Sequence, residues 1–126
     1  MANANKRKGD VFERAVTDRC NAAGVEAVRT RAGYEADYGD VHLASGPAGP
    51  RVILQCKNEA RIDLAGYVRA TEAQRLAAGA EHAAAVVKRR GVSDPGQSYV
   101  VTTLDAYLRL LRAAGLASPI SEQEAS

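Results

Sequence analysis

The chain of 126 residues contains few aromatic residues and lacks any long apolar run. Aromatic residues make up 5% of it and tryptophan is absent, so the core must consist mainly of Val, Leu, Ile and Ala. No apolar run approaches the roughly 18 residues that a membrane span needs. The first residues, MANANKRKGD, also lack the apolar segment of a signal peptide. We therefore expect neither a membrane segment nor a secretory leader.

Cysteine is equally scarce. The two cysteines, Cys20 and Cys56, have no spacing typical of a metal site, and they fall in a predicted helix and a predicted strand. Isolated thiols of this kind are typical of reduced cysteines in an intracellular protein. We therefore expect a cytoplasmic location.

The composition is otherwise that of an ordinary globular protein. Hydrophobic residues make up 46% of the chain and charged residues 25%. A chain of this length fits one domain, and it can bury a core without disulfides. We expect a disordered N-terminal arm over residues 1–7, a single folded domain over residues 8–116 and a flexible tail over residues 117–126.

The distribution of charge is more informative than its sum. A net charge of +2 and a pI of about 8.7 do not by themselves indicate a nucleic-acid partner. Three basic clusters are separated along the sequence: Lys6, Arg7 and Lys8; Arg29 and Arg31; and Lys88, Arg89 and Arg90. Such clusters can converge in the fold into one surface that contacts DNA phosphates. The alternative interpretation is solvated surface charge.

Hydrophobic periodicity predicts three helices and five strands. Helices are predicted over residues 8–23, 63–78 and 104–114, and strands over residues 25–30, 38–44, 51–57, 83–88 and 98–103. Gly24 and Gly79 stand where the first two helices should stop, and the glycine- and proline-rich residues 45–50 predict a turn between antiparallel strands. This order predicts an α/β protein with a mixed β-sheet flanked by helices.

Two of the predicted strands carry polar side chains on one face. Because strand side chains alternate, Asp40 and His42 share a face of one strand, and Gln55 and Lys57 share a face of the next. If the strands pair, a carboxylate, an amide oxygen and an ammonium group meet at one end of the sheet. That combination indicates a site for a divalent cation and an anionic substrate. The alternatives are a lysine that protects a strand edge and a histidine with a structural role.

These motifs resemble a known superfamily of nucleases. Gly39-Asp40 followed by Gln55-Cys56-Lys57, at the end of a β-branched strand, is similar to the PD-(D/E)xK nuclease superfamily. Other residues resemble the Holliday-junction-resolvase branch of this superfamily, including its phage-type members. They are Lys8-Gly9, Glu13-Arg14, Gly24, Arg29 and the segments KRRG, DPG and SYVVTTL. The resemblance covers roughly residues 6–112. It implies a restriction-endonuclease-like core and a phage-encoded enzyme that cuts branched DNA during recombination.

The resemblance also implies a metal site built from carboxylates and carbonyl oxygens. The ligands of Mg²⁺ or Mn²⁺ would be the Asp40 and Glu13 carboxylates, the Gln55 side-chain oxygen and the Cys56 backbone carbonyl. The chain departs from the pattern at Gln55, where the superfamily has an acidic residue. A neutral amide supplies an oxygen but no charge, so we expect weaker metal binding, with Glu13 in compensation.

The remaining roles follow from the same resemblance. Lys57 would orient or deprotonate the attacking water, or stabilise the transition state, and the products would carry a 5′-phosphate and a 3′-hydroxyl. Gln74 and His42 are accessory candidates, and Glu59 and Asp37 are lower-ranked acids at the same end of the site. Two symmetric cuts in a junction imply a homodimer, which is the commonest oligomer.

Three other functions compete with a structure-selective nuclease. Gln55 in place of an acid favours a catalytically weak or inactive DNA-binding module of the same fold. A general nuclease or nickase without a preference for junctions is a second alternative. A protein adaptor is the weakest, because it would require a large apolar surface patch, and the sequence pattern does not indicate one.

Overall fold

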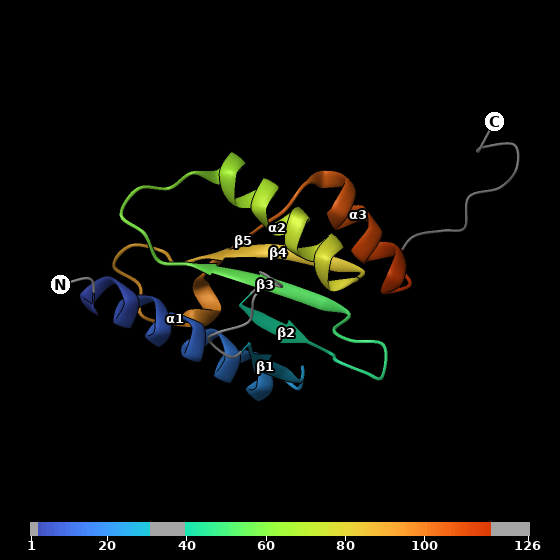
Figure 1. Cartoon of the computed structure of the whole chain (residues 1–126), viewed down its shortest axis with the longest axis horizontal. Coiled ribbons are helices and arrows are strands. Elements are labelled where there is room, and N and C mark those ends of the chain that lie inside the picture. Colours follow the sequence, from blue (N-terminus) through green and yellow to red (C-terminus); the bar gives the residue numbers. More distant parts are fainter. Residues whose placement is uncertain (1–2, 31–39, 117–126) are drawn as a thin grey trace, which may run out of the picture.

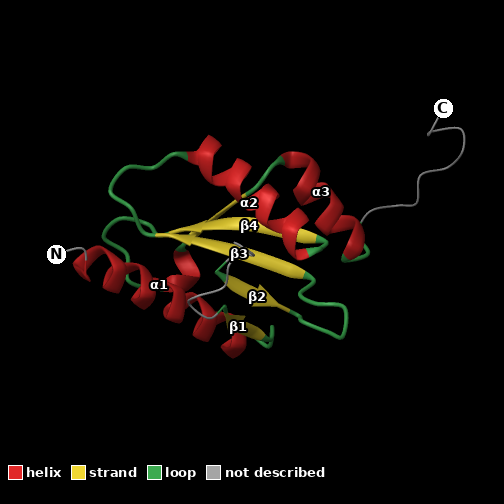
Figure 2. Cartoon of the chain, in the orientation of Figure 1, coloured by secondary structure: helices red, strands yellow, loops and turns green. Residues whose placement is uncertain are grey.

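The computed structural model describes residues 3–30 and 40–116, and side chains from residue 6 onward. These residues form a five-stranded sheet with helices on both faces (Figures 1 and 2). The elements, in chain order, are α1 (Asn3–Ala22), β1 (Ala27–Arg29), β2 (Val41–Leu43), β3 (Val52–Lys57), α2 (Leu64–Ala78), β4 (His82–Val87), η1 (Pro95–Gln97), β5 (Tyr99–Val101) and α3 (Leu104–Ala113). The predicted α/β class, with a mixed sheet flanked by helices, is confirmed. Within the described ranges no helix is long and apolar enough to cross a membrane.

The strands lie in the sheet in the same order as in the sequence. Strands β1, β2 and β3 pair antiparallel, β3 and β4 pair parallel, and β5 returns antiparallel to β4. The parallel pair is connected by α2, as a crossover between parallel strands requires. It brings the carboxyl ends of β3 and β4 together, where Lys57 lies opposite Val87. This arrangement is consistent with a restriction-endonuclease-like core.

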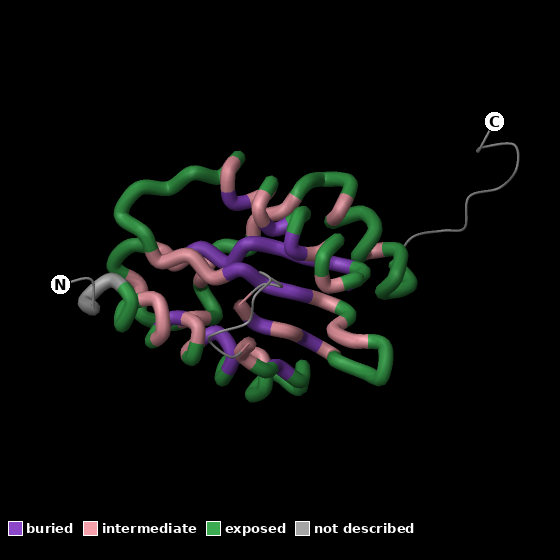
Figure 3. The backbone as a smooth tube through the Cα atoms, in the orientation of Figure 1, coloured by how far each residue is buried: buried purple, intermediate pink, exposed green. Residues whose placement is uncertain are grey.

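The core lies on both faces of the two central strands (Figure 3). Helix α1 covers one face, and α2 and α3 cover the other (Figure 1). Val41 and Leu54 are register partners, and both are buried with Phe12 of α1 in the first layer. Ile53 and Ala85 point to the opposite layer, as strand alternation requires. Residues at the ends of these strands are therefore held by a packed core.

Helix α2 ends where the sequence predicts. Asp63 caps its N-terminus by accepting a hydrogen bond from the Gly66 backbone nitrogen at 3.0 Å. Gly79 terminates it in the left-handed conformation, with φ of 67°, which glycine adopts without steric cost. The ends of this helix are thus set by local residues.

The bounds of α1 and of the short strands differ from those predicted. Helix α1 begins at Asn3, so residues 3–7 are helical where a disordered arm was predicted. Lys and Arg are good helix formers, and no proline or glycine interrupts this polar segment before Gly9. Strands β1 and β5 have three residues each, half of the predicted length, because β1 pairs only with the three residues of β2 and β5 only with the last three residues of β4. Strand β2, predicted over residues 38–44, is Val41–Leu43.

Candidate active site

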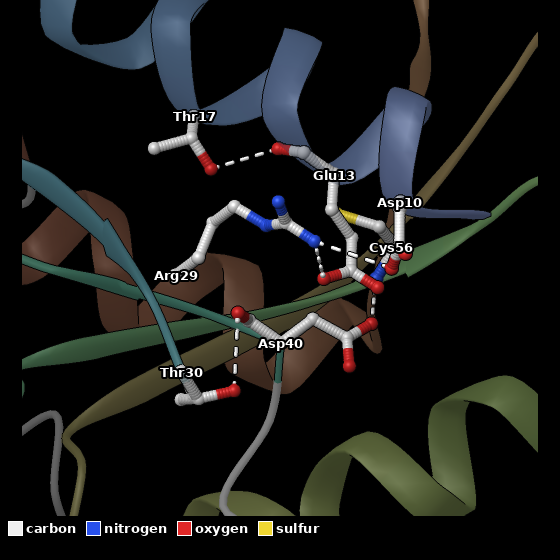
Figure 4. A network of polar contacts seen from close by, with 7 residues as sticks. All are labelled: Asp10, Glu13, Thr17, Arg29, Thr30, Asp40 and Cys56. Carbon is white, nitrogen blue, oxygen red and sulfur yellow. Dashed lines mark hydrogen bonds and ion pairs between the residues drawn. The ribbon is translucent and has the colours of Figure 1, made fainter. Parts of the chain in front are cut away.

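Asp40 lies at the start of β2, at the end of the β2–β3 ladder. Its backbone nitrogen donates to the Leu54 carbonyl at 2.9 Å, and its carbonyl accepts from the Thr30 nitrogen at 3.0 Å. Its carboxylate Oδ2 accepts a hydrogen bond from the Cys56 backbone nitrogen at 2.8 Å (Figure 4). The side chain of Asp40 therefore takes the place of the next ladder bond, and the carboxylate is fixed beside the predicted Gln-Cys-Lys motif.

Glu13 reaches the same region from α1. Figure 4 shows its carboxylate pointing toward Asp40 and the backbone of Cys56. The Arg29 guanidinium, from β1, lies 3.2 Å from the Glu13 carboxylate and 3.3 Å from that of Asp10. Arg29, predicted to contact DNA phosphate, is thus engaged with two acids of α1. Its ion pairs orient Glu13 toward Asp40.

The two predicted acidic ligands interact electrostatically. Partial burial raises the pKa of Glu13 above its usual value, and the nearby Asp40 carboxylate raises it further, against the opposing effect of Arg29. Two carboxylates that disfavour each other's ionisation form a site that a cation would stabilise. Burial, and then the Asp40 charge, also raise the pKa of the Cys56 thiol, so this thiol is protonated at neutral pH. Of the Cys56 atoms, only those of the backbone are therefore suited to bind a metal ion in this site.

The raised pKa of Glu13 predicts a specific pH dependence of stability. A carboxyl that holds its proton more tightly in the folded state contributes stability below its unfolded pKa, and that contribution is lost as pH rises through the folded pKa. The Glu13→Gln protein should therefore gain stability relative to the native chain as pH rises from 4.5 toward neutral. Thermal melts of both proteins across this range, in EDTA, measure it. A difference in melting temperature that does not change with pH would contradict the assignment.

Lys57, the last residue of β3, is held at the rim of the site. Its ammonium Nζ lies 3.8 Å from a carboxylate oxygen of Glu59 and 5.3 Å from the centre of the Tyr67 ring. The Tyr67 hydroxyl in turn donates to the Arg61 carbonyl at 3.1 Å. The lysine is half-buried between these groups. Its charge is therefore positioned by an acid and an aromatic face, not free in solvent.

Gln55 is buried beneath α2, and 7% of it is exposed. The Thr71 hydroxyl lies 3.3 Å from its side-chain oxygen, and the same hydroxyl donates its single proton to the closer Tyr67 backbone carbonyl at 2.7 Å. Together with Tyr67 and Gln74, Thr71 forms the buried face of α2 at positions i, i+4 and i+7. An amide oxygen has two lone pairs, so the contact with Thr71 leaves Gln55 able to coordinate a cation. Gln74 lies on the predicted helix and faces the sheet.

Two adjoining clefts open where β3 and β4 end. One has a volume of about 460 Å³ and is lined by Lys8, Gly9, Cys56, Lys57, Asn58, Glu59, Ala60 and Arg61. The other has a volume of about 480 Å³ and is lined by Lys8, Asn58, Glu59, Ala60, Ile62, Lys88, Arg89, Arg90 and Gly91. Of the three basic clusters, the first and the third therefore meet here, through Lys8 and the residues after β4. Arg29 lines neither cleft.

The basic residues after β4 have different roles. Lys88 holds its own loop, because its Nζ donates to the Val92 carbonyl at 2.9 Å. The Arg89 guanidinium lies 5.4 Å from the centre of the Tyr99 ring. Arg90 is exposed, and one of its nitrogens lies 3.4 Å from the Ala60 carbonyl across the cleft. Arg89 and Arg90 are thus the residues of this cluster best placed to contact an anion.

The other predicted site residues lie outside this centre. Lys6 and Arg7 are exposed on α1 and line neither cleft. His42 is half-buried within β2, opposite Ile53 of β3, and also lines neither cleft. Arg31 and Asp37 lie outside the described residues.

Several residues of the site were not predicted. Tyr67 and Thr71 position Lys57 and Gln55, and Asp10 shares Arg29 with Glu13. One signal was present in the sequence for the first two. Polar residues at i, i+4 and i+7 of a helix that must cover a sheet indicate polar partners on that sheet. Asp10 had no comparable signal, because its contact depends on how α1 crosses β1.

The donor set fits an open magnesium-like site and not a closed one. Among residues 6–30 and 40–116, no three His, Cys, Asp or Glu side chains gather so that they alone would hold a metal ion. Mg²⁺ usually binds through one or two carboxylates and completes its shell with waters and substrate phosphates. Glu13, Asp40 and the Cys56 carbonyl meet that requirement.

Comparison of the chain with protein-family models, with curated proteins and with solved structures gives no match. The function is therefore argued from the site itself.

Proposed function

We propose that this protein is a metal-dependent endonuclease that hydrolyses phosphodiester bonds of branched DNA, such as Holliday junctions, as a homodimer. One observation carries the proposal. The interacting carboxylates of Glu13 and Asp40 are joined, through the Cys56 backbone, to a cleft that Lys57 and Lys8 line. Acidic side chains that attract a divalent cation and basic side chains that attract a phosphate thus lie at one end of the sheet. Ligands of open α/β sheets commonly bind at this carboxyl end.

In the proposed reaction the residues of the site would have different roles. Asp40 and Glu13, with the Cys56 carbonyl and the Gln55 side-chain oxygen, would hold Mg²⁺ or Mn²⁺. A bound ion of this kind lowers the pKa of a water ligand and neutralises charge on the phosphate. Lys57 would orient the attacking water and stabilise negative charge in the transition state. Arg29 positions Glu13 and does not touch the phosphate.

The basic residues support a DNA substrate that is recognised by its shape. Lys8, Arg89 and Arg90 line one of the two clefts at this end of the sheet, where they would contact the phosphates on either side of the cut. Glu13 and Asp40 line neither cleft, and Cys56, which Asp40 contacts, lines the adjoining one. Phosphate contacts fix the position of a nucleic acid but carry no sequence information. A nuclease built on them would distinguish substrates by backbone geometry, which supports branched DNA.

The substrate assignment is tested with a labelled four-way junction, a Y-fork and a linear duplex of matched sequence, each with Mg²⁺, with Mn²⁺ and with EDTA. We expect metal-dependent cleavage that is fastest on the junction and leaves 5′-phosphate ends. Equal cleavage of all three substrates would keep the nuclease and exclude the preference for junctions.

The environment of Gln55 favours a second candidate, an inactive DNA-binding module of the same fold. The Gln55 side-chain oxygen is buried beside the Thr71 hydroxyl at 3.3 Å, so it has a polar neighbour without any metal. The Gln55→Glu protein tests whether position 55 faces a metal, and its buried carboxylate should lower stability in EDTA by about 1–3 kcal/mol. If position 55 faces the metal, Mn²⁺ should restore stability more in this variant than in the native chain. Thermal melts with and without Mn²⁺ measure this, and an equal response of both proteins would remove Gln55 from the ligand set.

A further inference from the structure

Exposed apolar side chains are concentrated in the last part of the described chain. Seven of the thirteen large hydrophobic residues that are exposed within residues 6–30 and 40–116 fall between positions 99 and 116: Tyr99, Val100, Leu104, Tyr107, Leu108, Leu110 and Leu116. Helix α3 has no buried residue, although its sequence places three leucines on one side of the helix (Figure 3). The sequence pattern did not indicate this concentration of exposed apolar side chains. Such a patch usually marks an interface.

The apolar residues of α3 form one stripe. Leu104, Leu108 and Leu111 follow each other at i, i+4 and i+7, which places them along one line of the helix. Leu104 is 71% exposed and Leu108 47%, whereas Leu111 is half-buried. The exposure of the stripe therefore increases from Leu111 to Leu104, and α3 contacts β4 on the side of the sheet where β5 forms the edge.

Opposite charges flank this stripe at its two ends. Asp105 follows Leu104 directly, and Arg112 follows Leu111 directly, so both charges lie on the same side of the leucines. If a second α3 packs antiparallel with the crossing at Leu108, Asp105 of each helix lies beside Arg112 of the partner subunit. A two-fold interface must be complementary to itself, and this arrangement satisfies that condition in both apolar contact and charge.

We propose that the α3 stripe is a docking surface for a second copy of this chain, related by a two-fold axis near Leu108. The inference deepens the homodimer of the proposed function. Its test measures association without DNA or metal, so its failure is distinguishable from failure of the nuclease. In solution the native chain would have twice the single-chain mass of 13.3 kDa.

Sedimentation equilibrium of the full chain tests this surface. The Leu108→Glu protein should be a monomer, because two carboxylates would meet at the axis. The Val28→Glu protein, altered at a residue 55% exposed on the opposite edge strand β1, should remain a dimer. A monomeric native chain at its highest soluble concentration, or loss of dimers in Val28→Glu alone, would overturn the proposal.

A reciprocal exchange of charge makes the test independent of any folding defect. Asp105→Arg and Arg112→Asp should each weaken dimerisation at low salt by at least tenfold, since like charges then face each other. The double variant, which carries both exchanges, should recover most of the native affinity. Recovery is specific to the antiparallel pairing of Asp105 with Arg112. Failure of the double variant to recover, when its circular dichroism is native, would contradict that pairing.

Discussion

The Lys57→Ala protein should cleave DNA about 10²–10⁴-fold more slowly than the native chain while binding it with similar affinity. The reason is the position of the ammonium group, which lies between Glu59 and the Tyr67 ring at the rim of the cleft. A group in that place acts on the water and the transition state more than on the ground state of the substrate. The loss should therefore appear in the cleavage rate and not in binding.

Single-turnover cleavage and fluorescence anisotropy with the same labelled junction measure the two quantities. Arg69→Ala is the matched control, because it removes an exposed positive charge from α2 that lines neither cleft. The control should cleave at the native rate. If Lys57→Ala keeps the native cleavage rate, or loses affinity and rate in equal proportion, Lys57 is a phosphate contact and not a catalytic residue.

The Asp40→Asn protein should lose Mn²⁺ affinity by more than the 10–100-fold typical of residues that only support a metal ligand, and should lose cleavage with it. Asn retains an oxygen that can accept the hydrogen bond from the Cys56 nitrogen, so the strand end should keep its structure. Removal of the Asp40 charge should also lower the pKa of Glu13, because the Asp40 carboxylate is one of the groups that raise this pKa.

Calorimetric titration with Mn²⁺ and an NMR titration of the Glu13 carboxyl measure these effects. Asp18→Asn, which removes an exposed carboxylate elsewhere on α1, is the control for nonspecific attraction of the cation. Native Mn²⁺ affinity in Asp40→Asn would place the metal elsewhere. An unchanged Glu13 pKa would mean that the two carboxylates do not share a site.

Local residues were sufficient to predict much of the fold. Asp63 and Gly79 set the ends of α2 through contacts within a few residues, and the apolar run before Lys88 predicted the buried β4. The start of α1 was missed because a polar composition was taken for disorder, whereas residues with good helix propensity can extend a helix beyond the part of it that is packed on the core. The strands β1, β2 and β5 were predicted too long, because the residue pattern does not reveal over how many residues a strand pairs with its neighbour.

For the candidate site, the sequence could predict which types of residue take part but not the contacts between them. The alternation of two strands placed Asp40 and Lys57 at the same end of the sheet, and the structure has them there. The sequence could not predict that Arg29 would bind Glu13, or that Thr71 would bind Gln55, since each contact joins residues 16 positions apart on different elements. Such contacts depend on how the helices cross the sheet, which no local pattern encodes.

The exposed leucines of α3 illustrate a further limit of the sequence pattern. Their helical spacing predicted a helix with Leu104, Leu108 and Leu111 on one side, and the helix is present. Periodicity reports that an apolar face exists but not what covers it. Here the sheet ends at β5, so part of that face remains on the surface.

The most direct test of the account is cleavage of a labelled four-way junction by the native chain in Mg²⁺ and in EDTA, beside Lys57→Ala in Mg²⁺. The account predicts cuts with 5′-phosphate ends by the native chain in Mg²⁺, none in EDTA and a severe loss in the variant. Junction binding without cleavage in Mg²⁺, and equally in Mn²⁺, would contradict it and would assign the chain to DNA binding alone.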